Sequence, residues 1–412
     1  MTRSHVLAAL LVVVSCFGLT TAAVGQGFPE VYLTDGERLA ATRARVMAGD
    51  PSLKPAVEAL VALAEEAMTK PMRSVVEKPT VPPSGDKNDY VSLSPYWWPN
   101  PDTADGLPYV RRDGEINPER YEYDVDKLGT FGNCVQWLGF AYYYTGDERY
   151  AEEAVKRVRH FLLDPETRMN PRMLFGQFVP GRSDGRKFGI IETLRLRWVP
   201  DAISLLEGSD AMTAEDLAGA KAWFGAYARW LNSSEFGVGE RDGPNNHGTW
   251  CEAQIAYFSL FAGDEATVKE MAARVPARVD QQIEADGRQP HELTRTRALD
   301  YSEFNLRGHT ELAVLAEKVG VNLWDYEAED GSSIRAAADF VLPYLTGSKP
   351  WPYQQISPPR HDFYAQTLRR LAVGLEDPRF EMEGVRKLDN LSGSGRVYID
   401  LVMPLPAGFP VR

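Results

Sequence analysis

The chain has 412 residues, of which 58 are acidic and 45 are Lys or Arg, giving a formal net charge of −13. A hydrophobic share of 44% and a charged share of 25% are typical of a soluble globular protein and exclude disordered, collagen-like and polytopic membrane classes. The pI near 5.1 argues against a general nucleic-acid binder, because affinity for phosphates comes from Lys and Arg. It does not exclude every polyanion, since field focusing depends on the charge inside a cleft.

Residues 1–25 have the features of a signal peptide. A positively charged start is followed by an apolar run at 6–14, which is too short to span a bilayer, and then by small residues. We expect cleavage after Ala23 or Gly25 and a periplasmic or secreted protein. Lipid anchoring at Cys16 is the alternative, because the residues before it resemble a lipoprotein cleavage box. No later segment is apolar enough to be transmembrane.

Most of the remaining chain has helical periodicity. The predicted helices are 54–70, 130–144, 147–163, 190–206, 214–231, 248–261, 265–283, 333–345 and 362–373. The clearest strand signal is at 397–401. The sequence therefore predicts an all-α protein in which residues 26–412 form a single domain, with a core at about 37–375 and a C-terminal extension at 376–412.

One internal similarity indicates repeated helical hairpins. Residues 134–158 align with 251–275 at an offset of 117, matching a Cys, a Gly-Asp-Glu turn and an Arg-Val pair. Gly suits the end of one helix and Asp the start of the next, so the repeat favours a solenoid or a closed α/α barrel. A Cys134–Cys251 bridge is conceivable, but we expect two buried free thiols.

Two stretches interrupt the helical pattern, at 78–117 and 347–360, and both are rich in Pro, Gly and aromatic residues. Long ordered loops in compact domains are often functional. Their aromatic rings suit sugar faces, although the loops could equally cap the barrel.

The densest polar cluster is Asn245-Asn246-His247-Gly248-Thr249-Trp250, at the start of a predicted helix. Amide and imidazole groups at a helix N-terminus can hold an anion. The alternative is that one asparagine only caps the helix and His247 is an ordinary surface residue.

A second cluster places Arg295 and Arg297 six and four residues before Tyr301. Arg295 can pair with a carboxylate in fork geometry, and Tyr301 can transfer protons if a positive charge lowers its pKa. The alternative is a charged helix surface with Tyr301 packed in the core.

Together the clusters contain the groups that β-elimination from a uronate requires. The proton at C5 is hardly acidic until the adjacent carboxylate is neutralised. Amide, imidazole and guanidinium groups can neutralise it, and a base and an acid must also be present. Asn246, His247, Arg295 and Tyr301 supply these types.

These residues also carry a family resemblance. The motif Asn245-Asn246-His247-x-x-Trp250, followed about fifty residues later by Glu-Leu-x-Arg-x-Arg-Ala-Leu-x-Tyr, resembles the alginate lyase family with the α/α-toroid fold. The loop motifs at 84–90, 95–101, 106–109 and 112–114 resemble the branch classed as polysaccharide lyase family thirty-eight, which includes glucuronan and alginate lyases. The resemblance covers about 78–355 and implies an incomplete (α/α) toroid or barrel of helical hairpins, with long aromatic loops over the cleft.

Carried over by motif, the resemblance implies that Asn246, His247 and Arg295 neutralise the carboxylate and that Tyr301 is the catalytic acid/base. This chain has one residue fewer between the first Arg and the Tyr than the family's best-known members, so Arg297 is the alternative to Arg295. Further candidates for substrate binding are Lys87, Tyr96, Trp97 and Arg112 in the loop, Asn133, Gln136 and Trp137 by the offset of 117, and Trp250, Arg297 and Tyr353. We expect Arg295, His247, Lys87 and Arg112 to form a basic stripe.

The expected substrate is an anionic β-1,4-linked polyuronate, glucuronan or mannuronan-type alginate. In both polymers H5 and O4 lie on one face, so one tyrosine could perform a syn elimination, whereas guluronate needs a second group such as His247. We expect no metal and no cofactor, because the histidines lack zinc spacing and no phosphate loop, dinucleotide motif or nucleophile elbow is present.

Two other functions remain open at the level of sequence. A glycoside hydrolase on a similar barrel would need two opposed carboxylates, for which Glu192, Glu252, Glu292 and Asp300 are candidates. A non-catalytic polysaccharide-binding protein would use the aromatic loops as a platform.

Overall fold

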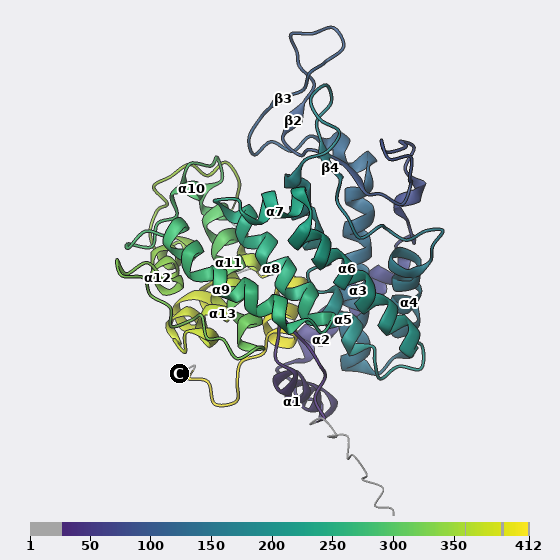
Figure 1. Ribbon diagram of the computed structural model, residues 1–412. Helices are drawn as coiled ribbons and strands as arrows, with labels where there is room; N and C mark the ends of the chain where they lie inside the picture. The colour runs from purple at the N-terminus through teal and green to yellow at the C-terminus, as the bar shows by residue number, and fades with distance from the viewer. Residues whose placement is uncertain (1–26, 359, 389–390, 411–412) are drawn as a thin grey trace, which may run out of the picture.

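The computed structural model describes residues 27–358, 360–388 and 391–410 and is shown in Figure 1. The predicted signal peptide and Cys16 lie outside this part of the chain. Within it, no helix is both long and apolar enough to cross a membrane.

The described chain is mostly helical, as predicted. Its α-helices are α1 (Gly36–Met47), α2 (Lys54–Thr69), α3 (Asp124–Thr145), α4 (Glu148–Val158), α5 (Val199–Leu205), α6 (Ala214–Ser233), α7 (Glu235–Arg241), α8 (Asn246–Phe261), α9 (Glu265–Gln282), α10 (Pro290–Leu293), α11 (Ala298–Glu317), α12 (Ile334–Leu345), α13 (His361–Gly374) and α14 (Gly393–Val397). Short 3-10 or π segments are η1 (Val75–Glu77), η2 (Pro118–Glu122), η3 (Arg159–Leu163), η4 (Lys187–Leu196), η5 (Phe380–Gly384), η6 (Val385–Lys387) and η7 (Tyr398–Val402).

Four short strands lie in or beside the first long loop. β1 (Val91–Leu93) pairs in parallel with β4 (Phe175–Phe178), and β2 (Trp97–Trp98) pairs antiparallel with β3 (Val110–Arg111). Trp97 faces Arg111 in the second pair. The β2–β3 hairpin projects from one end of the molecule (Figure 1), so the loop is an ordered structure that stands over the helices.

The two hairpins predicted from the internal similarity are present as α3–α4 and α8–α9. Gly146 and Gly263 turn with φ of 72° and 84°, a conformation that favours glycine. Asp147 and Asp264 then cap the following helices by accepting backbone hydrogen bonds. Cys134 and Cys251 are buried free thiols, as expected.

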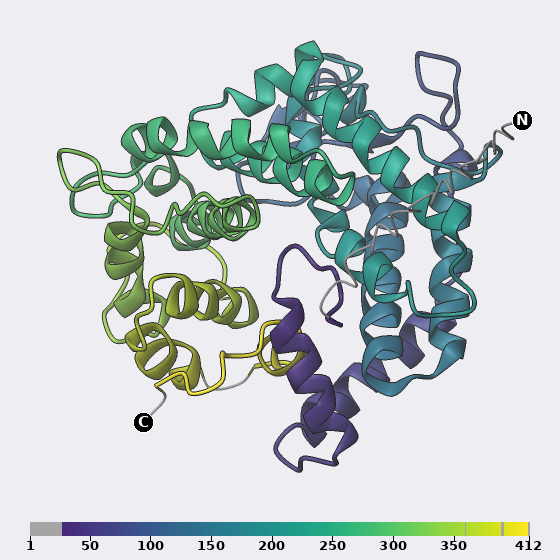
Figure 2. The ribbon, with the colours of Figure 1, turned by 60° about the horizontal axis from the view of Figure 1, so that its bottom comes forward.

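The helices are arranged around a ring (Figure 2). α3 packs against α2, α4 and α5, while α8 packs against α6, α9 and α11, and α11 continues to α12 and α13. The ring is an incomplete toroid and not the closed barrel that the repeat allowed.

The segment before α1 lies on the inner side of the ring (Figure 2). Val31, Tyr32 and Leu33 are buried, and Asp201 of α5 accepts hydrogen bonds from the backbone N–H groups of Tyr32 and Leu33. Thr34 donates its hydroxyl proton to the carbonyl of Val402 near the other end of the chain, at 2.5 Å. The first and last parts of the described chain are therefore fastened together.

Two predictions about secondary structure are wrong. The segment 397–401 is helical and not a strand, because Ser392 caps α14 and the chain continues into η7. Its apolar run is short and buried, and such a run does not distinguish strand from helix. The predicted helix 190–206 is interrupted at Trp198, which separates η4 from α5.

Candidate active site

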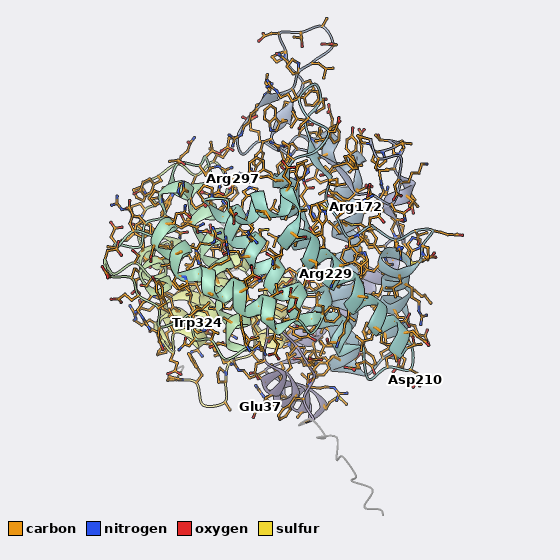
Figure 3. The ribbon with its side chains drawn as sticks, in the orientation of Figure 1. Glu37, Arg172, Asp210, Arg229, Arg297 and Trp324 are labelled. Atoms are coloured by element: carbon orange, nitrogen blue, oxygen red, sulfur yellow. The ribbon has the colours of Figure 1, made fainter. Side chains whose placement is uncertain are left out.

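A cavity of about 690 Å³ opens between the first loop, η4 and the starts of α8 and α11. Eight of the predicted site residues line it, namely Tyr96, Trp97, Asn246, His247, Trp250, Arg295, Arg297 and Tyr301. Figure 3 labels Arg297, which lies toward the end of the molecule that carries the β2–β3 hairpin, whereas Glu37 and Asp210 lie toward the opposite end. The fold thus joins the two polar clusters and the aromatic loop in one place.

Asn246 is held at the start of α8 by a buried carboxylate. Glu292 of α10 accepts hydrogen bonds from the Asn246 backbone N–H at 2.8 Å and from its Nδ2 at 2.7 Å. Burial raises the pKa of Glu292, although both hydrogen bonds oppose that shift. Asn245 caps the helix through the backbone N–H of His247. The capping interpretation is therefore right for Asn245. Asn246 lines the cavity, and its Oδ1 has no hydrogen-bond partner in the described part of the chain.

His247 is oriented by a second buried carboxylate. Its Nδ1 makes a short hydrogen bond with Oε1 of Glu240, a residue of α7 that is 1% exposed. Phe188 packs edge-on against the imidazole with ring centroids 5.2 Å apart. Since Nδ1 is engaged, Nε2 is the nitrogen left for a ligand. Glu240 was not predicted from the sequence, because it lies seven positions before His247 on another helix and matches no motif.

Tyr301 lies at the centre of a hydrogen-bonded group. Its hydroxyl is 2.9 Å from the hydroxyl of Tyr96 and accepts a hydrogen bond from Nη2 of Arg295 at 2.8 Å. The guanidinium carbon of Arg295 is also 3.8 Å from the centre of the Tyr301 ring. Burial raises the pKa of Tyr301 and the neighbouring Tyr96 adds to this, while the positive charge of Arg295 lowers it. The net direction is upward, so the side chain is a phenol at neutral pH.

Asp113 connects the first loop to this group. Arg295 donates to Asp113 at 2.9 and 3.3 Å, and Arg297 donates to the carbonyl of Gly114 at 2.6 Å. Burial alone would raise the pKa of Asp113, but the hydrogen bond and charge of Arg295 outweigh it and lower the pKa. Arg295, and not Arg297, is the arginine that contacts the Tyr301 hydroxyl.

The cavity is strongly basic. Its lining contains nine arginines and three carboxylates. The arginines are Arg111, Arg120, Arg186, Arg195, Arg197, Arg295, Arg297, Arg307 and Arg360, and the carboxylates are Glu192, Asp300 and Glu303. The acidic excess lies elsewhere, for example at the exposed Glu65 and Glu66 of α2. The expectation of a basic cleft on an acidic molecule is confirmed, although Lys87 and Arg112 do not line the cavity.

Six predicted binding residues are placed outside the cavity lining. Arg112 packs on Trp98 and Tyr353 on Trp351, while Lys87 is exposed in the loop. On α3, Asn133 is exposed, Gln136 donates to the Tyr398 hydroxyl at 2.6 Å, and Trp137 packs on the Tyr398 ring.

The α3 residues miss the cavity because the two hairpins start differently. The offset of 117 places Gly129 at the position of Asn246, and α3 begins five residues before Gly129. A Cβ atom on Gly129 would lie 2.6 Å from the guanidinium of Arg195. The equivalent position therefore lies inside a helix and against a neighbouring side chain.

Comparisons with known proteins identify one family and one fold for this chain. The family model described as alginate lyase matches residues 74–351. A crystal structure of an alginate lyase from Bacteroides ovatus superposes with a TM-score of 0.85 at 35% identity, covering 90% of this chain and 98% of that one. A variant of alginate lyase A1-III in complex with a tetrasaccharide has a TM-score of 0.50 at 16% identity, covering 84% and 90% of the two chains, and supports the fold alone. No curated protein matches the sequence significantly.

Proposed function

We propose, from the premise that the chain belongs to the alginate lyase family, that it cleaves a β-1,4-linked polyuronate by syn β-elimination. The substrates would be glucuronan, mannuronan-type alginate or both, and the products would carry 4,5-unsaturated uronate ends. The observation that carries the proposal is the contact of Arg295 with the hydroxyl of Tyr301 in the cavity that also contains Asn246 and His247.

In this proposal Asn246, His247 and Arg295 neutralise the carboxylate of the reacting sugar. Glu292 accepts one N–H of the Asn246 amide, which leaves the second N–H for the sugar carboxylate, and Glu240 orients His247. Preorganised donors of this kind are effective because they do not reorient as negative charge develops. Neutralising the carboxylate makes the proton at C5 acidic enough to remove.

Tyr301 would carry the proton. Its phenol must first lose a proton to solvent, and the hydrogen bond and charge of Arg295 stabilise the phenolate. The phenolate oxygen then takes H5, the C4–O4 bond breaks, C4 and C5 become doubly bonded, and the same proton passes to O4. This returns Tyr301 to the phenolate and fits polymers in which H5 and O4 share a face.

The hydrolase alternative is disfavoured because the carboxylates in the cavity are occupied. Glu192 is bonded to Arg120 at 2.7 Å and to Tyr90 at 2.8 Å. Asp300 accepts from Ser357 and Tyr364. Glu303 accepts from the Thr367 hydroxyl and lies 3.5 Å from Arg307. Outside the cavity lining, Glu252 is paired with Arg274 and Arg278, and Glu292 is bonded to Asn246. A glycosidase needs two carboxylates free to face the scissile bond.

One assay tests the proposal. The protein is incubated with glucuronan, mannuronan and polyguluronate, and the ultraviolet absorbance of the unsaturated product is followed. We expect absorbance with one or both of the first two polymers. New reducing ends without absorbance would indicate a hydrolase, and neither signal would indicate a binding protein. The protein is proposed to act after export, in the periplasm or outside the cell.

A further inference from the structure

The basic cavity has a second group of arginines, separate from the Arg295–Tyr301 contact. Arg307 of α11 lines the cavity but is only 5% exposed. Its Nε and Nη1 are buried and have no hydrogen-bond partner among the described residues. Buried guanidinium groups normally have their N–H donors satisfied, so an unsatisfied guanidinium in the lining of a cavity indicates a ligand.

The local charges leave this group positive. Arg197, Arg307 and Arg370 lie close enough to affect one another electrostatically. Glu311 pairs with both Arg197 and Arg370, which leaves Arg307 a looser contact of 3.5 Å with Glu303. Burial lowers the pKa of Arg370 to about 10 and raises that of Glu303. Three cations thus share two close carboxylates, and of these groups Arg197, Arg307 and Glu303 line the cavity.

The surroundings of Arg307 restrict its movement. Its guanidinium carbon is 4.3 Å from the ring centre of Phe363 and 5.3 Å from that of Phe304, and both rings line the cavity. A guanidinium held between aromatic faces presents its N–H groups in a fixed direction, which suits a planar carboxylate.

Arg307 is displaced along α11 from the contact between Arg295 and Tyr301. It lies six residues after Tyr301, a rise of about 9 Å along a helix. We propose that Arg307, with Arg197 beside it, forms a second carboxylate subsite, which binds the carboxylate of a sugar unit flanking the one that reacts. This inference rests on the proposed function and deepens it, because the enzyme would then bind the carboxylates of two sugar units along the polymer.

The test compares Arg307→Gln with wild type on oligomannuronates, or oligoglucuronates if these are the better substrate, of increasing length. We expect KM to rise about tenfold to hundredfold for oligomers long enough to reach the second subsite. The KM of the shortest cleaved oligomer and all values of kcat should stay close to wild type. Calorimetric titration of the uncleaved oligomers into a Tyr301→Phe background should show the same length-dependent loss of affinity.

Glu303→Gln is the matched control. If Arg307 only serves an ion pair with Glu303, both variants lose thermal stability alike and KM is unaffected in both. If Arg307 binds a substrate carboxylate, removing the competing Glu303 charge does not raise KM. A rise in KM in Arg307→Gln that is equal at every length would overturn the subsite. Absence of unsaturated product from wild-type protein would instead overturn the proposed function, so the two failures are distinguishable.

Discussion

The hairpins α3–α4 and α8–α9 both turn at a glycine and cap the second helix with an aspartate, yet only one of them contributes the start of its first helix to the cavity. α8 begins at Asn246, whose backbone and side chain both bond to Glu292. α3 begins at Asp124, so the equivalent position, Gly129, is inside the helix and faces Arg195. The two first helices therefore start at different positions of the repeat. This difference places the start of α8, but not the equivalent residue of α3, at the cavity.

The largest expected effect is on Tyr301 of α11, which lines the same cavity as the start of α8. Tyr301→Phe should lower kcat by about 10³-fold, because it removes the only oxygen of this side chain that could take H5 and protonate O4. The initial rate of absorbance increase measures this. Thermal unfolding of the variant checks that the fold is intact. Activity near that of wild type would refute the acid/base role of Tyr301.

Two asparagines, one from each hairpin, test whether α8 and α3 differ in function. Asn246→Ala should lower kcat/KM by about 10²-fold, since one preorganised donor to the reacting carboxylate is lost. Asn133→Ala on α3 should leave the rate unchanged, because Asn133 is exposed and outside the cavity lining. Both variants are assayed on the same polymer. A comparable loss in Asn133→Ala would mean that α3 does bind substrate and that the two hairpins are functionally alike.

The pH profile sharpens the role assigned to Tyr301. Since burial raises its pKa and the base form is the phenolate, kcat/KM should increase with pH, by about tenfold per unit below that pKa. Arg295→Gln removes the charge that lowers the pKa, so its profile should move to higher pH as well as fall. Initial rates at low substrate concentration measure both curves. A rate that falls as pH rises through neutrality would show that Tyr301 acts only as an acid.

The smallest expected effects are on the free energy of unfolding, and they compare one glycine of α8, Gly248, with one of α3, Gly129. A Cβ on Gly248 would lie 2.2 Å from the carbonyl oxygen of Gly243, whereas one on Gly129 would meet the far end of Arg195 at 2.6 Å. Backbone cannot give way as a flexible side chain can. Gly248→Ala should therefore cost about 1–3 kcal/mol and Gly129→Ala less, as measured by urea unfolding. The reverse order would contradict the packing difference between the helices.

The sequence predicted the features that depend on local chemistry. Helical periodicity and the Gly-Asp turns indicated the hairpins, and the clusters around His247 and Tyr301 were recognised because motif and chemistry agree. It did not predict contacts between distant segments. Asp113 lies in the loop motif at 112–114, but nothing there indicated its contact with Arg295, 182 positions away. Glu240 contacts His247, seven positions away on the next helix, and no motif marks it. The segment 397–401 was predicted as a strand because its residues are β-branched and aromatic. Such residues indicate that a segment is buried, but they do not show which neighbouring element packs on it or whether it is a strand or a helix.

The fastening of Thr34 to Val402 has a consequence for how the protein folds. Its two groups are 368 positions apart in the chain, and Lys318 also donates to the Thr34 carbonyl at 2.9 Å. Contacts at such separations form late, because the entropy of closing a long loop must be overcome first. The hydrogen bond between Thr34 and Val402 can therefore form only after synthesis has reached η7. A nascent chain that is shorter than this lacks the contact that holds its inner segment in place.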